Sequence, residues 1–325
     1  PLADRVLIKP AKEGLFKKEM ETIDVAFLAV HGTNGEDGAL QGYMEMLKLP
    51  YTSSDVLGSA IGQDKAIMKE ILMYEGIEIV DWFYFYAHDF DQNKEEYLAK
   101  ADAIGYPLII KPANLGSSIG IEIAHNREEF SEKVKAASEY DFKIVVEKMI
   151  QNLKEVNCSV MGTIFEAKAS PIEEVMKNDE ILSFENKYLG SNTKGTKGVK
   201  ATKGVKSEAT KGSKGMASTS RRVPALIGDD KTEYVKKTAL KVFKVLNASG
   251  CVRIDFMIDQ DTDKVYVNEI NSIPGSLAFY LWQEEGVNFT KECDMLIQNA
   301  LVRYRHKEKM TFSFDTNILS TYRRK

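Results

Sequence analysis

The sequence predicts an α/β protein with more than one domain, and three observations predict it. Short apolar runs end at glycine-bearing loops and lead into segments with helical spacing, which is the pattern of strand–loop–helix units. Later in the chain, a long amphipathic helical segment is followed by two strands joined by an acidic turn. The chain has 325 residues, of which 43% are hydrophobic, so it is long enough for two or three domains that each bury a core.

Composition excludes several classes of protein. Lys and Arg number 44 against 48 Asp and Glu, so binding of nucleic acid or anionic lipid would need a local basic patch. We find neither an apolar run of about 18 residues nor a signal-peptide pattern. Cys158, Cys251 and Cys293 fit neither a disulfide framework nor a zinc site. We therefore expect a cytoplasmic protein with no membrane or nucleic-acid partner. Because it begins with Pro1 and enters a strand-like run at residues 5–8, we also expect an upstream segment to be missing.

The first predicted unit is a buried parallel strand over residues 24–30, followed by the loop HGTNGEDG and a helix through Leu40, Met44 and Leu47. In such units ligands bind at the carboxyl end of the strand. The loop is therefore a candidate binding segment.

Further elements follow along the chain. Helical spacing extends over residues 59–74, 128–137 and 232–246. Strands are expected over residues 107–111, 143–149, 155–161, 251–258 and 264–270, the third of them half-buried because its apolar residues alternate. Residues 191–222 hold repeated TKG triplets, with seven Lys and two Arg against the single acid Glu208, and we expect a mobile loop there.

The two last strands form a hairpin that carries most of the chemistry. Counting outward from its turn pairs Asp255 with Glu269 and Arg253 with Asn271, within a one-residue error of register. Two adjacent carboxylates raise each other's pKa unless a cation lies between them. Oxygen ligands of this kind suit Mg²⁺ together with substrate phosphates. An ordinary solvated hairpin face is the alternative.

The turn DQDTD is no EF-hand, because Lys264 and Ile270 occupy the positions that need Gly and Glu. Other candidate contacts for phosphate and nucleotide are Lys65 on its helix, Lys111 at the end of an apolar strand, and the small residues of 114–120. Glu147 ends another apolar strand and could contact a nucleotide base. A simple turn and solvated charges are the alternatives for these features.

In order, the motifs HGTNGEDGALQG, SAIGQDK, LIIKPANLGSSIG, VVEKMI, ENKY, RIDF and NEINSIPG resemble those of D-alanine–D-alanine ligases of the ATP-grasp superfamily, over residues 24–303. The resemblance implies that ATP lies between two α+β lobes and phosphorylates the carboxylate of a first D-alanine. The amine of a second D-alanine then attacks the acyl phosphate, which yields a dipeptide for peptidoglycan synthesis.

The resemblance also implies a domain plan. Residues 1–62 would form part of an N-terminal parallel-sheet domain, and residues 63–150 the small ATP-grasp lobe. Residues 151–305 would form the C-terminal lobe, with residues 191–222 as its basic lid, and residues 306–325 a tail. Family members often form homodimers, so a homodimer is one assembly that the resemblance allows.

Carried onto matching positions, the resemblance implies a nucleotide and metal site. The phosphates would contact Lys65, Lys111 and Lys187. The adenine would face Glu147, Lys148 and Met149, and the ribose Glu155. Two Mg²⁺ ions, or Mn²⁺, would bind Asp255, Glu269 and Asn271.

The implied catalytic residues surround the amino-acid substrates. The Arg253 side chain and the Gly275 backbone N–H would stabilise the oxyanion of the tetrahedral intermediate. The first D-alanine would be placed by His31 and Glu36, and Ser117 or Ser118 would pair with Tyr188 over the substrate.

Two departures from the family pattern leave alternatives open. No counterpart is found for an N-terminal glutamate that anchors the first D-alanine, and Tyr280 stands near where a serine commonly meets the second substrate. The alternatives are a carboxylate–amine ligase with another amino acid as acceptor, and an ATP-binding module without catalysis. Nucleic-acid binding by the lysine-rich loop is a further alternative.

Overall fold

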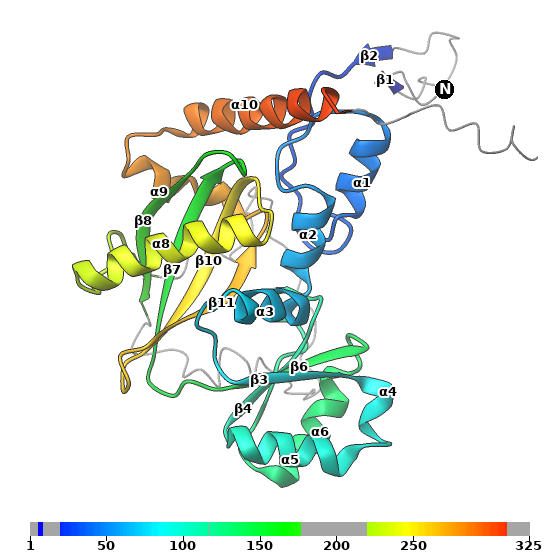
Figure 1. Ribbon diagram of the computed structural model, residues 1–325, viewed down its shortest axis with the longest axis vertical. Helices are drawn as coiled ribbons and strands as arrows, with labels where there is room; N and C mark the ends of the chain where they lie inside the picture. Colours follow the sequence, from blue (N-terminus) through cyan, green and yellow to red (C-terminus); the bar gives the residue numbers. More distant parts are fainter. Residues whose placement is uncertain (1–5, 9–19, 117, 177–219, 311–325) are drawn as a thin grey trace, which may run out of the picture.

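The computed structural model describes residues 6–8, 20–116, 118–176 and 220–310, and two lobes follow each other along the long axis of the molecule (Figure 1). Each lobe is built on its own sheet, and all strand pairs within these two sheets are antiparallel. The predicted mixture of helices and sheets is confirmed.

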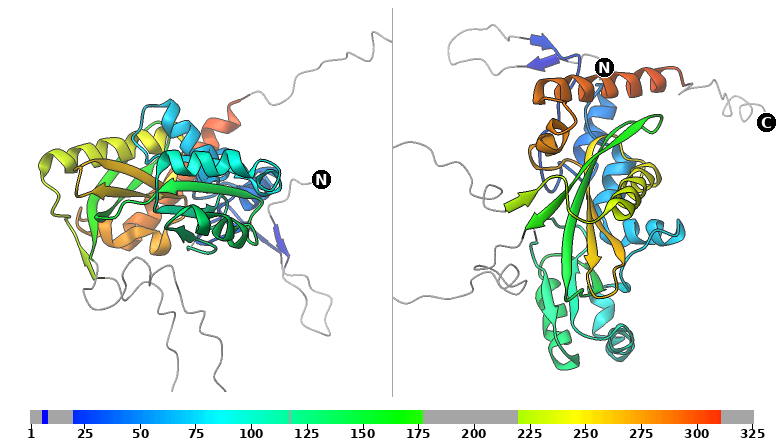
Figure 2. Two further views of the ribbon diagram at one scale, coloured as in Figure 1. Left: turned by 90° about the horizontal axis from the view of Figure 1, so that it is seen from below. Right: turned by 90° about the vertical axis from the view of Figure 1, so that its left-hand side faces the viewer.

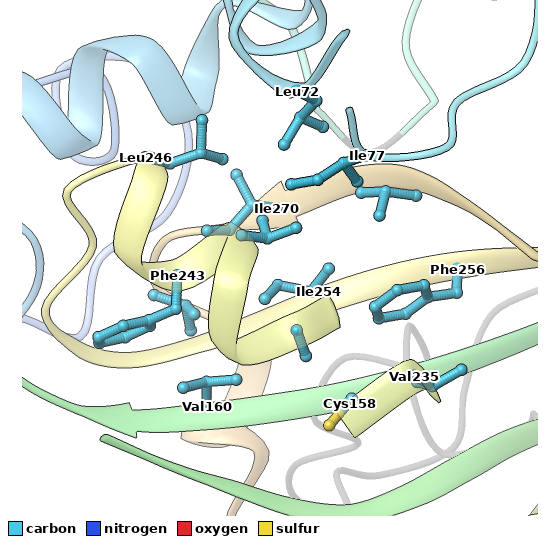
Figure 3. Packing of buried hydrophobic residues seen from close by; sticks show 14 of the residues in the cluster. Leu72, Ile77, Cys158, Val160, Val235, Phe243, Leu246, Ile254, Phe256 and Ile270 are labelled. Atoms are coloured by element: carbon cyan, nitrogen blue, oxygen red, sulfur yellow. The ribbon is translucent and has the colours of Figure 1, made fainter. Parts of the chain in front are cut away.

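The larger lobe holds a five-stranded sheet of order β11–β10–β7–β8–β9. Its strands span Val265–Asn271, Gly250–Asp259, Leu153–Gly162, Ala167–Met176 and Ser220–Arg222. Helix α8 (Asp229–Val245) covers one face (Figure 1). Figure 3 shows the resulting core, in which Val235 and Phe243 of α8 pack with Val160, Ile254 and Phe256 of the strands. The alternate residues of β10, Arg253 and Asp255, therefore lie on the face opposite α8.

Strand β7 is more buried than its alternation predicted. Asn157, Ser159 and Met161, on the face away from α8, are buried as well. The reason is tertiary: Trp282 of α9 (Phe279–Gln283) donates a hydrogen bond to the Ser159 hydroxyl at 3.1 Å and helps to cover this face. The prediction of a half-buried strand is wrong.

The smaller lobe holds a four-stranded sheet of order β3–β6–β4–β5. Its strands span Trp82–Tyr86, Lys143–Lys148, Leu108–Pro112 and Glu122–Ala124. The helices of this lobe are α4 (Ala87–Phe90), α5 (Lys94–Ile104) and α6 (Arg127–Ala137). Helices α5 and α6 pack on one face through a core that includes Leu98, Phe130 and Ile110 (Figure 1). The other face meets α3 (Lys65–Tyr74) through Ala66.

The helix predicted over residues 59–74 is two helices, α2 (Val56–Gln63) and α3, separated at Asp64. Asp64 has extended backbone angles, and its carboxylate accepts hydrogen bonds from the N–H groups of Ala66 (3.0 Å) and Ile67 (3.1 Å). An Asp in this role caps a new helix. Hydrophobic spacing continues across the break, so periodicity alone did not reveal it.

The parallel strand predicted over residues 24–30 is wrong as a regular element. In the described residues this segment forms one parallel bridge, between Ala26 and Tyr51, and Phe27 and Val30 are 37% and 41% exposed. A buried parallel strand needs strand neighbours, and the described hairpin of β1 (Val6–Ile8) and β2 (Met20–Thr22) pairs only with itself. The helix predicted next is confirmed as α1 (Ala39–Met46).

The last described helix packs against an early part of the chain. Helix α10 (Phe289–Glu308) crosses the end of the larger lobe that is remote from the smaller lobe (Figure 2). There Arg303 donates hydrogen bonds to the carbonyls of Ser53 and Tyr51, the latter at 2.9 Å. This contact ties α10 to the segment between α1 and α2.

Candidate active site

A cleft of three adjoining cavities lies where the two lobes meet. The cavities have volumes of about 550, 1400 and 950 Å³, and Ser118 and Glu269 line all three. Lys65 of α3 and Arg253 of β10 also line the largest cavity. Residues from distant parts of the sequence therefore share one connected space.

The hairpin register predicted from the sequence is confirmed. Arg253 lies opposite Asn271, and Asp255 lies opposite Glu269. A β-bulge interrupts the pairing next to Asp255 and leaves Asn268 as the extra residue of β11. Because of this bulge, Asn268 and Glu269 both line the cleft, although Val267 just before them belongs to the core under α8.

Asp255 is held by charge and by hydrogen bonds. The Arg253 guanidinium donates two hydrogen bonds to its carboxylate, from Nε to Oδ1 at 2.7 Å and from Nη2 to Oδ2 at 2.8 Å. Asn271 Nδ2 donates a third, to Oδ2 at 3.0 Å. The charge of Asp255 raises the pKa of Arg253. Burial raises the pKa of Asp255, against the effect of Arg253, and the neighbouring Glu269 carboxylate raises it further.

The side chains of Asp255, Glu269 and Asn271 are suitable ligands for a divalent cation. Two carboxylates and one carboxamide supply only oxygen ligands, and a cation between Asp255 and Glu269 would relieve the repulsion that raises the pKa of Asp255. The part of the chain that the structure describes contains no group of three or more His, Cys, Asp or Glu side chains arranged for a metal. Mg²⁺ in proteins commonly completes its coordination with water and substrate phosphates.

Lys65 and Lys111 face the same cleft from the side of the smaller lobe. The ammonium of Lys65 donates to the Leu115 carbonyl at 2.7 Å and lies 3.7 Å from Glu269 Oε2, and burial lowers its pKa. Lys111 Nζ lies 2.8 Å from Glu147 Oε2. The structure thus brings both predicted phosphate-binding lysines to the 550 Å³ cavity.

Sequence reasoning missed Lys69. This fully buried lysine lies on α3 and is 3.1 Å from Glu147 Oε1. The signal was present, because Lys65 and Lys69 are four residues apart and share one face of a helix. The helix was predicted from the spacing of its apolar residues, so a second lysine on the same face was not considered.

The predicted contacts to adenine and ribose divide into two groups. Glu147 and Glu155 line the 550 Å³ cavity. The Lys148 side chain instead donates to the carbonyls of Gly105 at 2.8 Å and Tyr106 at 3.3 Å, and neither Lys148 nor Met149 is among the residues that line that cavity. The prediction that Lys148 and Met149 face the adenine stays a prediction.

The predicted amino-acid contacts gather around the largest cavity. His31, Glu36, Ser118 and Gly275 line it together with Arg253. The Glu36 carboxylate accepts a hydrogen bond from the Gly32 N–H at 2.6 Å, which folds the loop back on itself. Ser117, Lys187 and Tyr188, like most of the predicted lid, lie outside the described residues.

The Gly275 turn has unusual backbone angles. The three residues after Gly275 in the turn η1 (Gly275–Ala278), Ser276, Leu277 and Ala278, all have φ near +55°. This left-handed region is unfavourable for residues with a side chain. Buried Leu277 and Ala278 anchor the turn beside the cavity.

A second group lines the 950 Å³ cavity, and of its members the sequence analysis singled out Tyr280 but not its partner Glu173. Tyr280 donates its hydroxyl to Glu173 Oε2 at 2.8 Å, and Arg221 Nε lies 3.3 Å from Glu173 Oε1. The guanidinium of Arg221 also stacks 4.5 Å from the centre of the Tyr280 ring. Burial, with the charge of Glu173, raises the pKa of Tyr280. An acid at the centre of the strand PIEEV was the available signal.

Comparison with known proteins agrees with this geometry. The family model described as D-ala D-ala ligase N-terminus matches residues 4–54, and the model described as D-ala D-ala ligase C-terminus matches residues 71–214 and 209–298. The chain belongs to the D-alanine–D-alanine ligase family. The family predicted from the motifs is confirmed.

Curated relatives of the family match along most of the chain. The D-alanine–D-alanine ligase of Thermosipho melanesiensis is 40% identical over 311 residues, which cover 95% of this chain and 75% of the relative. That of Thermosipho africanus is 36% identical, covering 91% of this chain and 73% of the relative.

Solved structures of the ligase family also match. The VanG D-Ala:D-Ser ligase from Enterococcus faecalis superposes with a TM-score of 0.70 at 26% identity, covering 87% of this chain and 74% of that chain. The D-alanine–D-alanine ligase from Bacillus anthracis complexed with ATP has a TM-score of 0.66 at 29% identity, covering 88% and 81%. The predicted ATP-grasp fold is thus confirmed for this ligase family member.

Among its described residues, no helix has the length and apolar character that a membrane crossing requires.

Proposed function

We propose that this protein is an ATP-dependent ligase that joins two D-alanine molecules through an acyl phosphate, for the synthesis of peptidoglycan precursors. The observation that carries the proposal is the Lys65–Glu269 contact at 3.7 Å, which brings the nucleotide side of the cleft onto the hairpin of Arg253 and Asp255. Family membership supports the same activity. Cytoplasmic location follows as a proposal, because the reaction consumes ATP.

In the first step, a carboxylate oxygen of the first D-alanine attacks the γ-phosphorus of ATP, and the bond to the bridging oxygen of ADP breaks. Lys65 and Lys111 would hold the phosphates, since both ammonium groups line the cavity. Glu147 and Glu155 are the candidate contacts for the base and ribose. Mg²⁺ bound by Asp255, Glu269 and Asn271 would neutralise phosphate charge; the proposal is of two such ions.

In the second step, the uncharged amine of the second D-alanine attacks the acyl carbon and the carbonyl oxygen becomes an oxyanion. The nitrogen gives its extra proton to water, and inorganic phosphate leaves as the carbonyl reforms. Arg253 and the N–H of Gly275 would stabilise that oxyanion, and His31 and Glu36 would place the first substrate. For Ser117, Ser118, Lys187 and Tyr188, the roles predicted from the resemblance remain predictions, as do the domain boundaries and the homodimer.

A second candidate is a ligase with a different acceptor amino acid. Tyr280 and Glu173 place a phenol and a carboxylate on the 950 Å³ cavity, with Arg253 on the same wall. Such polar groups can favour an acceptor other than D-alanine, because they can hydrogen-bond a polar side chain that D-alanine lacks.

The test is to supply the purified protein with ATP, Mg²⁺ and D-alanine and to measure phosphate release and dipeptide by mass spectrometry. We expect D-alanyl-D-alanine and phosphate in equal amounts. As a control, Arg253→Lys keeps the charge but loses the two-pronged grip, and its kcat should fall about 100-fold or more, as for loss of an oxyanion donor.

The outcomes separate the candidates. Phosphate released only with other amino acids selects the second candidate. Nucleotide binding without any turnover would leave an ATP-binding module, and the absence of nucleotide binding would overturn both ligase proposals.

A further inference from the structure

The Glu147 carboxylate lies between two lysine ammonium groups. Lys69 is 3.1 Å from its Oε1 atom, and Lys111 is 2.8 Å from its Oε2 atom. All three side chains are buried, with residue exposures of 0% for Lys69, 1% for Glu147 and 5% for Lys111. The two lysines lower the pKa of Glu147 to about 2 in spite of its burial, so it is ionised.

The two lysines differ in access to the cleft. Lys111 lines the 550 Å³ cavity together with Lys65. Lys69 lines none of the three cavities that the described residues form at the cleft, and its ammonium lies 6.0 Å from the centre of the Trp82 ring. Only one of the two partners of Glu147 can therefore meet a ligand directly.

This difference matters when an anion enters the cavity. A phosphate oxygen that binds Lys111 draws its ammonium away from Glu147 and places a second negative charge near the carboxylate. A buried carboxylate without a counter-charge is strongly unfavourable. With Lys111 as its sole partner, Glu147 would compete with the phosphate for that one ammonium.

We propose that Lys69 is a positioning residue that serves as the permanent counter-ion of Glu147, so that Lys111 can bind a phosphate of the nucleotide. Glu147 then holds Lys111 at the cavity wall without neutralising it. The inference rests on the proposed function, because it requires a nucleotide phosphate at Lys111, and it assigns no contact between Lys69 and the substrate.

The test uses the full chain with Lys69→Met and, as a second neutral variant, Lys69→Gln. In both, Glu147 should retain Lys111 as its partner, and the Kd and KM for MgATP should rise about tenfold, a typical coupling within one charged network. The kcat at saturating ATP should change less than threefold, because uniform binding is lost and not transition-state binding. Calorimetry with a non-hydrolysable ATP analogue and steady-state kinetics give these values.

The Glu147→Gln background separates positioning from simple packing. There the carboxylate is absent, so adding Lys69→Met should change the affinity for MgATP less than twofold. A matched control is Lys133→Met, which removes another paired lysine of the same lobe, 3.0 Å from Glu122 and outside the residues that line the cleft. It should lower stability and leave the affinity for MgATP unchanged.

The inference is overturned if the Lys69 variants reduce thermal stability but bind MgATP as the wild type does, or if the loss of affinity persists in the Glu147→Gln background. Failure of the proposed function would look different, because the wild type itself would then bind no MgATP or form no dipeptide.

Discussion

Glu292 carries an ionisable group into the interior of the larger lobe. It lies in the first turn of α10, where an acid is favourable, but its side chain is fully buried. Burial raises the pKa of Glu292 from 4.5 to about 7, and a weak interaction with the Cys251 thiol offsets part of that effect. The residue therefore makes stability depend on pH.

The sign follows from proton binding. Between pH 4.5 and about 7 the folded state binds more protons at Glu292 than the unfolded state does, so stability falls as pH rises through that range. We predict that Glu292→Gln is more stable than the wild type by about 1–3 kcal/mol at pH 8, with little difference near pH 4.5. Urea denaturation from pH 4.5 to 8 measures this, and a pH-independent difference would contradict it.

Single residues of the site were predictable to different degrees. Arg253 and Asp255 could be placed together because strand alternation fixes which side chains share a face. The two partners of Glu147 could not be predicted, because Lys69 and Lys111 come from a helix and a strand that meet only in the folded lobe.

At the scale of elements, Asp64 joins α3 to the smaller lobe. Its carboxylate caps α3 and also pairs with Lys143 of β6. The burial of Lys143 opposes the charged form, but this contact prevails and raises the pKa of Lys143. One side chain thus sets both the start of the helix and its position over the sheet.

We predict that Asp64→Ala lowers the free energy of unfolding by about 2–4 kcal/mol, since it removes the cap and leaves a buried lysine without its partner. Asp64→Asn keeps an acceptor for the cap and should lose less. Chemical denaturation of both variants measures the difference, and equal losses would show that the cap contributes nothing.

Strand β11 shows how local pattern and tertiary function meet. Its apolar residues Val265 and Val267 have a period of two, but the next core residue is Ile270, three positions later. That break in period marks the bulge and could have been read from the sequence. The position of Asn268 and Glu269 in a cleft could not be read from the sequence, because the opposite wall of the cleft belongs to the other lobe.

At the scale of the whole molecule, the cleft has charges of opposite sign on its two walls. Lys65 and Lys111 belong to one side, and Asp255 and Glu269 to the other. A nucleotide that binds both walls stabilises the arrangement of the two lobes as well as each site. The carboxylate wall repels phosphates unless a divalent cation is present.

We predict that ATP with Mg²⁺ raises the free energy of unfolding by about 2.7 kcal/mol at a ligand concentration of 100 times Kd. Removal of Mg²⁺ by a chelator should abolish most of the gain, because the carboxylates of Asp255 and Glu269 then repel the phosphates of ATP. Urea denaturation with and without the ligands gives both values, with Mg²⁺ alone as the control. An equal stabilisation by ATP in the presence of the chelator would contradict the predicted metal site.

The sequence alone determined the family, the mixed helix and sheet class, the hairpin register and the lysines of the cleft, because each follows from residue order or from local repeat geometry. Tertiary structure decided that residues 24–30 form a single bridge, that Asp64 divides a helix, and that Tyr280 meets Glu173. Contacts of this second kind depend on which distant segments pack together. Alternation and helical spacing depend only on residues that are near each other in sequence, so they cannot predict which residue lies on the opposite side of the cleft.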